Sequence, residues 1–154
     1  MNIKNQLEKL KINIPKAPKP VGAYVAYKQI DSLVFISGQL PIKENGDILT
    51  GKIGANLSIE QGKEAAQLCT LNILAQINKA CDNKLENVKS CIKITGYINS
   101  TEDFKDQPII LNTSSDIISN IFGQNGLHSR VAVSVNSLPL GAAVEIDAIF
   151  EVNK

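Results

Sequence analysis

The spacing of hydrophobic residues between Ser58 and Asn83 is that of a long amphipathic helix. Apolar side chains recur three or four positions apart and would form one broad buried stripe. Ser58 and Gln61 have the spacing of a capping box, and Glu60 adds a negative charge to the first turn, where the helix dipole favours it. The sequence therefore predicts a helix that begins at Ser58 and ends near residues 81–83.

Two further segments carry a helical pattern. Residues 103–122 place apolar side chains on one face, and Gly123 supplies a natural stop because glycine tolerates the backbone conformation that ends helices. Residues 3–10 predict a shorter helix with its apolar residues on one side. Residues 14–20 are rich in proline and predict a connector.

Runs rich in valine, isoleucine and alanine predict five strands. Asp31 and Ser32 separate the first two runs and predict a hairpin turn. The runs are residues 21–30, 33–37, 88–98, 130–137 and 142–152. Together with the two long helices they predict a single α+β domain over residues 1–154, with both helices packed on one face of a mixed sheet.

The other face of that sheet has a mixed composition that predicts self-association. Val144, Ile146, Ala148 and Phe150 alternate along the last strand and should pack under the helices. The opposite face is expected to carry residues from two strands. They are Ala143, Glu145, Asp147 and Ile149, and, on the side of Arg130, Ala132, Ser134 and Asn136. Such a face suits packing against another copy of the chain, so we expect a homo-oligomer, with an open monomer as the alternative.

Composition and charge argue against several classes of partner. The net charge is +1 with acids and bases interspersed, whereas nucleic-acid binding needs a basic stripe. No stretch reaches the roughly 18 apolar residues of a membrane span, and residues 1–11 lack the apolar block of a signal peptide, so we expect a cytoplasmic protein. The three cysteines form no metal-binding pattern. We therefore expect no metal or cofactor, and we expect Cys69 and Cys81 to be buried.

Arg130 is the only arginine, beside fifteen lysines. It opens an apolar strand, where its planar guanidinium presents a fork of donors that matches a carboxylate or a phosphate as lysine does not. The fork predicts an anion partner. That partner is either a ligand or, in the alternative interpretation, a nearby carboxylate of the protein.

Four segments occur in an order that is typical of a known family. They are Pro20–Tyr24, Val34–Pro41, Ser129–Val133 and Leu138–Ile149. With the elements between them, they make residues 17–152 resemble the Rid/YjgF family of reactive-intermediate deaminases, formerly called L-PSP endoribonucleases. The resemblance implies a chorismate-mutase-like fold and a homotrimer with clefts between subunits, with residues 1–16 as an N-terminal extension.

The resemblance also implies a reaction and a set of roles. The implied reaction is the hydrolysis of 2-imino or enamine acids to 2-keto acids and ammonia. Arg130 would hold the carboxylate of this small-molecule substrate, and Glu145 would orient or activate water. Tyr24 and Gly38 would line the cleft. The chemistry is plausible on its own terms, because an imine carbon is already electrophilic and needs only orientation and a general base.

The chain departs from the better-known members of the family. They carry cysteine two residues after the arginine, where this chain has Ala132, and they lack the long loop at residues 43–56. The long loop and the N-terminal extension indicate a longer subgroup. His128, beside Arg130, is a further candidate for the cleft, the alternative being a loop histidine without a role. The polar helix residue of the cleft has three candidates, Asn112, Ser114 and Ser115.

Two other functions fit the same sequence. A binding or regulatory protein would hold a small carboxylate in the cleft without turnover, and the change at Ala132 motivates this alternative. RNA cleavage is the second, suggested by the older family name. The near-neutral charge and the single histidine argue against it.

Overall fold

The computed structural model describes residues 2–153 and contains one five-stranded sheet in the order β1-β2-β5-β3-β4. Only β3 and β4 are parallel neighbours, and the other pairs are antiparallel. The strands are β1 Tyr27–Ile30, β2 Leu33–Gln39, β3 Val88–Asn99, β4 Ser129–Val135 and β5 Val144–Val152. The helices are α1 Ile3–Lys9, α2 Ile59–Ala80 and α3 Gln107–Phe122, and short 3₁₀ turns span Leu85–Asn87, Gly123–Gly126 and Pro139–Gly141. The mixed α+β architecture predicted from the sequence is confirmed.

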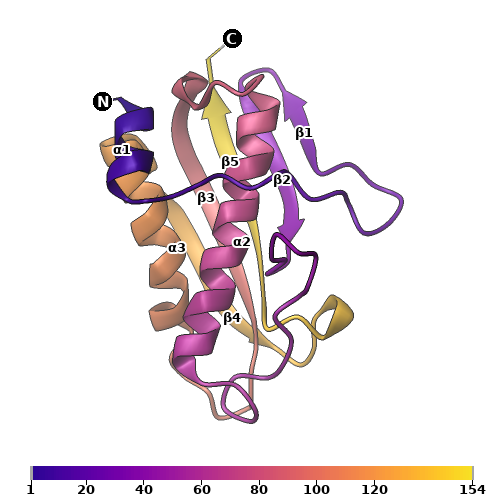
Figure 1. The fold of residues 1–154 in the computed structure, drawn as a ribbon. Helices are drawn as coiled ribbons and strands as arrows, with labels where there is room; N and C mark the ends of the chain where they lie inside the picture. Colours follow the sequence, from indigo (N-terminus) through magenta and orange to yellow (C-terminus); the bar gives the residue numbers. More distant parts are fainter. Residues whose placement is uncertain (1, 154) are drawn as a thin grey trace.

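The long helix α2 forms where the hydrophobic spacing predicts it. Ser58 caps it by accepting a hydrogen bond from the backbone of Gln61, whose side chain in turn accepts one from the backbone N–H of Ser58. α3 begins later than the predicted segment, at Gln107, and Gly123 caps it with a positive φ of 61°. Both helices cover the same face of the sheet, as Figure 1 shows, and α1 packs beside α3.

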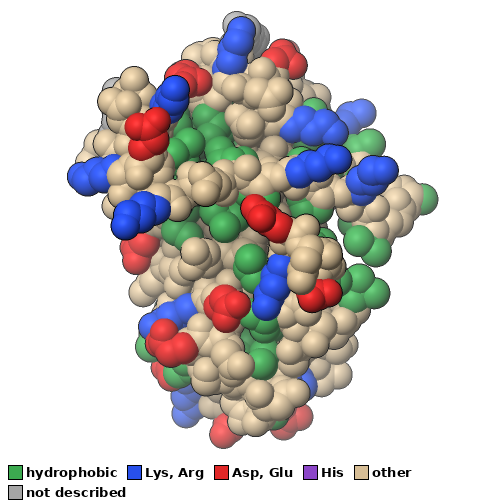
Figure 2. All heavy atoms as spheres, viewed as in Figure 1, with side chains coloured by type: hydrophobic (Ala, Val, Ile, Leu, Met, Phe, Trp, Pro, Cys, Tyr) green, Lys and Arg blue, Asp and Glu red, His purple; other side chains and the backbone are tan. Residues whose placement is uncertain are grey.

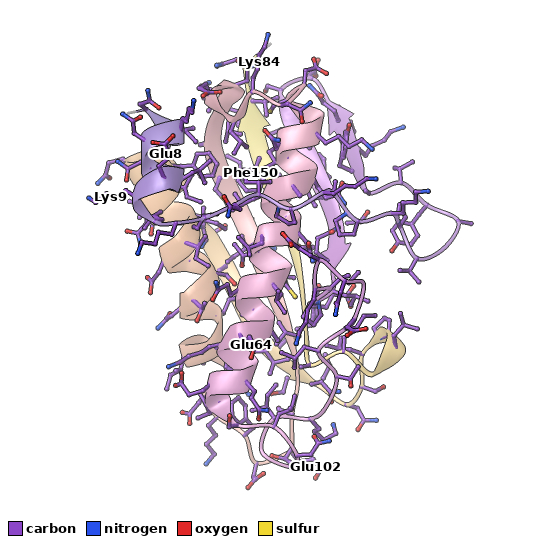
Figure 3. All side chains as sticks on the ribbon, in the orientation of Figure 1. Glu8, Lys9, Glu64, Lys84, Glu102 and Phe150 are labelled. Carbon is purple, nitrogen blue, oxygen red and sulfur yellow. The ribbon has the colours of Figure 1, made fainter. Side chains whose placement is uncertain are left out.

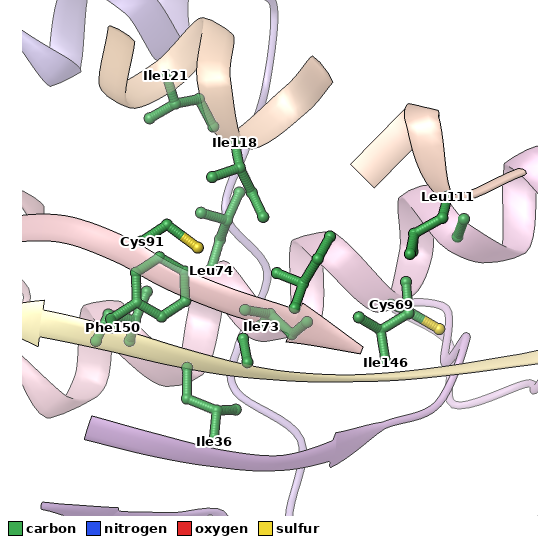
Figure 4. Close-up of a cluster of buried hydrophobic side chains, with 14 of the residues drawn as sticks. Ile36, Cys69, Ile73, Leu74, Cys91, Leu111, Ile118, Ile121, Ile146 and Phe150 are labelled. Atoms are coloured by element: carbon green, nitrogen blue, oxygen red, sulfur yellow. The ribbon is translucent and has the colours of Figure 1, made fainter. Parts of the chain in front are cut away.

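The core lies between the helices and the sheet. Leu74 from α2, Ile118 from α3 and Cys91 from β3 converge there with Phe150 (Figure 4). Phe150 is fully buried behind α2 (Figure 3), and its ring packs edge-on against Phe122 at a centroid distance of 6.2 Å. All three cysteines are free and buried, as expected for Cys69 and Cys81, and burial raises the pKa of the Cys91 thiol to about 12.

The first strand is shorter than predicted. The hairpin and its turn at residues 31–32 are confirmed, but β1 covers only Tyr27–Ile30 instead of residues 21–30. Residues 21–25 are all exposed and pair with no strand. Gly22 has a φ of 139°, outside the extended range of a strand, and the first backbone hydrogen bond to β2 is the one that Ala26 accepts from Ser37, directly before β1.

The two faces of the sheet differ from the prediction at β4. Val144, Ile146, Ala148 and Phe150 do pack under the helices. However, β4 pairs with β3 rather than with β5, and in that register Arg130, Ala132 and Ser134 face the helix layer. The prediction that they share a face with Glu145 is therefore wrong. Ala143 is fully buried before β5 begins, because the loop around Leu49 covers it, and Asn136 lies beyond the end of β4.

The face opposite the helices carries exposed apolar side chains. Phe35, Val131 and Val133 are 40%, 44% and 39% exposed there. The helix-side surface, in contrast, shows charged groups of both signs scattered over it (Figure 2). Among residues 2–153, no helix has the length and apolar character needed to span a membrane.

Candidate functional site

A cleft of about 340 Å³ lies where β2 ends. Three predicted site residues, Tyr24, Gly38 and Glu145, line it together. They come from the loop before β1, from β2 and from β5. The structure therefore brings together three residues that are far apart in the sequence.

A β-bulge shapes the floor of the cleft. The register between β2 and β5 shifts between Ile36 and Gln39, which leaves Gly38 in the irregular segment. A Cβ added at Gly38 would collide with Oε1 of Glu145 and would lie 2.9 Å from its Cδ. Glycine at this position therefore lets the carboxyl group of Glu145 lie directly against the backbone. Ser37 anchors the neighbouring loop, because its hydroxyl donates to the carbonyl of Val25 at 2.7 Å.

The environment of Glu145 disfavours its charged form. Burial raises the pKa of its carboxyl group, and the like charge of Asp147, two positions along β5, raises it further. Asp147 accepts a hydrogen bond from the hydroxyl of Tyr97 at 3.3 Å. A half-buried carboxylate with a raised pKa is typical of a general base or acid.

Arg130 lies in a second cluster, on α3 and β4. Its Nη1 donates to Oγ of Ser115 at 3.1 Å and its Nη2 donates to the carbonyl of Pro108 at 3.4 Å. Ser115 also lies 2.9 Å from Nε2 of His128, whose Nδ1 is 2.6 Å from the carbonyl of Gly126. That carbonyl can only accept, so the contacts fit an imidazole with its proton on Nδ1 and a serine hydroxyl that donates to Nε2.

Arg130 has no acidic partner among the residues that the structure describes. The ion pairs there all involve lysine, and both acceptors of the guanidinium are neutral oxygens. The interpretation of Arg130 as half of a salt bridge within its own chain is therefore wrong. A half-buried guanidinium with spare donors is able to bind an external carboxylate.

Arg130 and Glu145 lie on opposite faces of the sheet. Ile94 of β3 pairs with Arg130 and with Ala148, and it is fully buried under the helices. Tyr97, three positions later on β3, pairs with Glu145 on the open face. The cleft is thus near β2, whereas Arg130 is on β4 at the other edge of the sheet.

The remaining predicted site residues divide between these two regions. Ala132 follows Arg130 on the helix side of β4. Among the three helix candidates, Ser115 contacts Arg130, whereas Ser114 is buried against Thr70 of α2 and Asn112 is exposed. His128 joins the cluster of Arg130 and not the cleft. No group of three potential metal ligands occurs within residues 2–153.

Several lining residues of the cleft were not predicted. The sequence of residues 14–20 predicts only a connector, yet Pro18, Lys19 and Pro20 line the cleft. Pro139, from the turn before β5, also lines the cleft. The signal that could have identified residues 18–20 is their position directly before Tyr24, since a proline-rich segment keeps a fixed extended shape.

Comparisons with known proteins identify the family. A family model described as "YjgF/chorismate mutase-like, putative endoribonuclease" matches residues 5–151. Protein TCP17 of Trypanosoma cruzi is 39% identical over 148 residues, which cover 96% of this chain and 92% of that protein. The 2-iminobutanoate/2-iminopropanoate deaminase of Mus musculus is 32% identical over 139 residues, covering 90% of this chain and 87% of the relative.

Solved structures agree with the sequence comparisons. Protein Atu1372 of Agrobacterium tumefaciens superimposes with a TM-score of 0.89 at 36% identity and covers 98% of this chain and 94% of that one. TdcF of E. coli, solved with bound serine, gives 0.65 at 27% identity and covers 90% and 94% of the two chains. The resemblance seen in the sequence is confirmed, and the chain belongs to the YjgF/chorismate mutase-like family.

Proposed function

We propose that this protein hydrolyses 2-imino and enamine acids to 2-keto acids and ammonia, in a cleft that a neighbouring copy of the chain completes. The observation that carries the proposal is the guanidinium of Arg130, which is half-buried and has no carboxylate partner within residues 2–153. The deaminases among the relatives, and the serine bound to TdcF, support a small amino-acid-like ligand.

The proposed reaction needs one orienting group and one base. Arg130 binds the substrate carboxylate through its fork and places the C=N carbon beside a water molecule. Glu145 accepts a proton as the water oxygen bonds to that carbon. Glu145 returns this proton to nitrogen, which gives a carbinolamine. The second proton of the water then passes from the new hydroxyl group to nitrogen as the C=O bond forms and the C–N bond breaks, so the products are a 2-keto acid and ammonia. An enamine enters the same route after a proton moves to its carbon and converts it to the imine. The raised pKa of Glu145 strengthens it as a base near neutral pH.

The proposal requires two chains in each site, because Arg130 and Glu145 lie on opposite faces of one sheet. The exposed apolar side chains of the open face, Phe35, Val131 and Val133, provide a surface for packing against a neighbour. The β4 edge of one copy would then meet the cleft of the next. Head-to-tail contacts form a ring when the rotation between neighbours closes, and we propose that three copies close it as a homotrimer.

Turnover of an imino acid tests the proposed function directly. An amino-acid oxidase generates the imine, and the purified protein is expected to accelerate its loss with release of one ammonia per keto acid. Calorimetry with a 2-keto acid runs in parallel. Binding of the keto acid without any acceleration would contradict the enzyme and leave a binding protein, and the absence of both would contradict the site altogether.

The acid limb of the pH profile should report Glu145. As a base it works only when deprotonated, so kcat/KM is expected to fall as the pH drops through its pKa, which burial and Asp147 hold above the ordinary value. Asp147→Asn removes the like charge and should move this limb to lower pH. Glu151→Asn, at the far end of β5, is the control and should leave the limb in place. If the acid limb of kcat/KM stays at the same pH in Asp147→Asn, its assignment to Glu145 is wrong.

A further inference from the structure

α2 carries two amide side chains inside its buried face. Asn72 and Gln76 are one turn apart and only 3% and 1% exposed. Asn72 donates to the carbonyls of Leu40 and Ile42 at 3.0 and 3.1 Å, directly after β2. Gln76 donates to the carbonyl of Pro18 at 2.8 Å. Both amides therefore bind backbone of segments that line the cleft.

The segment held by Gln76 has almost no other hydrogen bonds. We call residues 13–24 the strap, which crosses α2 before it reaches β1 (Figure 1). Within the described part of the chain, no backbone–backbone hydrogen bond involves the strap, and the bond from Gln76 to Pro18 is its only one to a side chain. Yet the strap supplies five lining residues of the cleft: Pro18, Lys19, Pro20, Val21 and Tyr24.

Gln76 also connects the strap with the floor of the cleft. Its Nε2 lies 3.4 Å from Oε1 of Gln39, and Nε2 of Gln39 donates to the carbonyl of Ser37 at 2.9 Å. Ser37 in turn donates to Val25, just beyond the strap. The amides of Gln76 and Gln39 thus link Pro18 of the strap to the bulge that holds Gly38, and the hydroxyl of Ser37 links the same bulge to Val25. Gln76 itself is buried, so its amide N–H would be costly to leave without an acceptor, which favours the position of the strap that pairs it with Pro18.

We propose that Gln76 is a positioning residue, which fixes the strap as a wall of the substrate cleft without touching the substrate. The link to substrate rests on the proposed function, whereas the tether itself does not. Without the amide, the carbonyl of Pro18 loses its partner and the strap opens more often, because no other hydrogen bond to the strap occurs among residues 2–153.

Two substitutions test the tether. Gln76→Met keeps the length of the side chain and removes the donor, and Gln76→Asn keeps the amide but shortens its reach. Limited proteolysis with trypsin, followed by mass spectrometry, measures cleavage between Lys16 and Ala17 in the folded protein. Cleavage tracks the open population when opening is fast, so both variants are expected to release the fragment that begins at Ala17 about tenfold faster.

Steady-state kinetics separates positioning from simple destabilisation. Both variants should raise KM about tenfold and change kcat less than about threefold, because a displaced wall weakens binding rather than chemistry. Thr70→Val is the matched control. It removes a buried hydrogen bond to Ser114 between α2 and α3, so it should lower thermal stability without changing KM or strap cleavage.

The two readouts also separate this inference from the proposed function. Strap cleavage at the wild-type rate in both variants, or equally faster cleavage in Thr70→Val, would overturn the tether whatever the activity. Faster cleavage with an unchanged KM would overturn the positioning role. If the wild type shows no turnover, the proposed function fails, and the proteolysis still decides whether Gln76 holds the strap.

Discussion

Replacing Arg130 by alanine is expected to lower kcat/KM for an imino acid by about 10³-fold. The guanidinium would donate two charge-assisted hydrogen bonds to the substrate carboxylate, and each such bond contributes on the order of 1.5–3 kcal/mol. Removing both also frees the substrate to rotate away from the water. Arg130→Lys keeps the charge but not the fork, so it should still lose about 10²-fold.

The control for Arg130 is a lysine on the neighbouring strand. Lys93 of β3 pairs with Ser129, one position before Arg130, so Lys93→Ala removes one positive charge from the same part of the sheet. It should change kcat/KM less than about threefold, because Lys93 lies on the open face of the sheet whereas Arg130 faces the helix layer. Equal activity of Arg130→Ala and wild type would refute the proposed role of Arg130.

Replacing Glu145 by glutamine is expected to lower kcat by about 10²–10⁴-fold with little change in KM. The amide has nearly the same shape but cannot accept the proton of the attacking water. Substrate binding is assigned to Arg130, so it should survive. Glu151→Gln is the matched control, because Glu151 lies on the same strand and is engaged by Lys89 and Ser90 far from the cleft. An unchanged kcat in Glu145→Gln would show that another group activates water.

The same variant should be slightly more stable than the wild type at neutral pH. The pKa of Glu145 is raised by the fold, so the folded state favours the protonated carboxyl group. The protonated carboxyl group of Glu145 therefore adds to the free energy of unfolding. This stabilisation is fully present below the unfolded-state pKa of about 4.3 and is lost as the pH rises through the folded-state pKa. Thermal denaturation should show a gain for Glu145→Gln at pH 7 that vanishes near pH 4. A stability loss at pH 7 would indicate a structural role instead.

The sequence predicted most of the elements because each has a local cause. The capping box at Ser58, the stop at Gly123 and the turn at residues 31–32 act over a few residues and appear in the structure where expected. The alternation along β5 likewise placed Phe150 in the core. These signals depend on neighbouring residues alone.

The faces of β4 depend on long-range pairing and could not be predicted in the same way. The alternation along β4 shows that Arg130 and Ala132 lie on the same face of the sheet. Which face this is depends on the parallel register with β3, where Arg130 pairs with Ile94 on the helix side. The prediction assumed that β4 and β5 are neighbours because a short turn at Pro139 connects them. In the structure β3 lies between them, so Arg130 and Glu145 end on opposite faces.

The cleft was predicted in part. Tyr24, Gly38 and Glu145 were identified through the family resemblance, and the structure brings them together. The strap was not identified, since its one hydrogen bond to a side chain comes from Gln76, 58 positions after Pro18 in the sequence. A buried glutamine on a helix stripe looks like an exception to the pattern until its partner is known.

Mixing two inactive variants tests the central claim most directly. Arg130→Ala retains Glu145, and Glu145→Gln retains Arg130, so a site shared between neighbouring copies is intact wherever the two variants meet in the right order. Random co-assembly after joint refolding should therefore restore about a quarter of the wild-type activity, since half of the copies supply each intact group. The separately refolded variants, combined without exchange, should stay inactive. Failure of the co-assembled mixture to regain activity, although native mass spectrometry shows mixed oligomers, would contradict a cleft built by two chains.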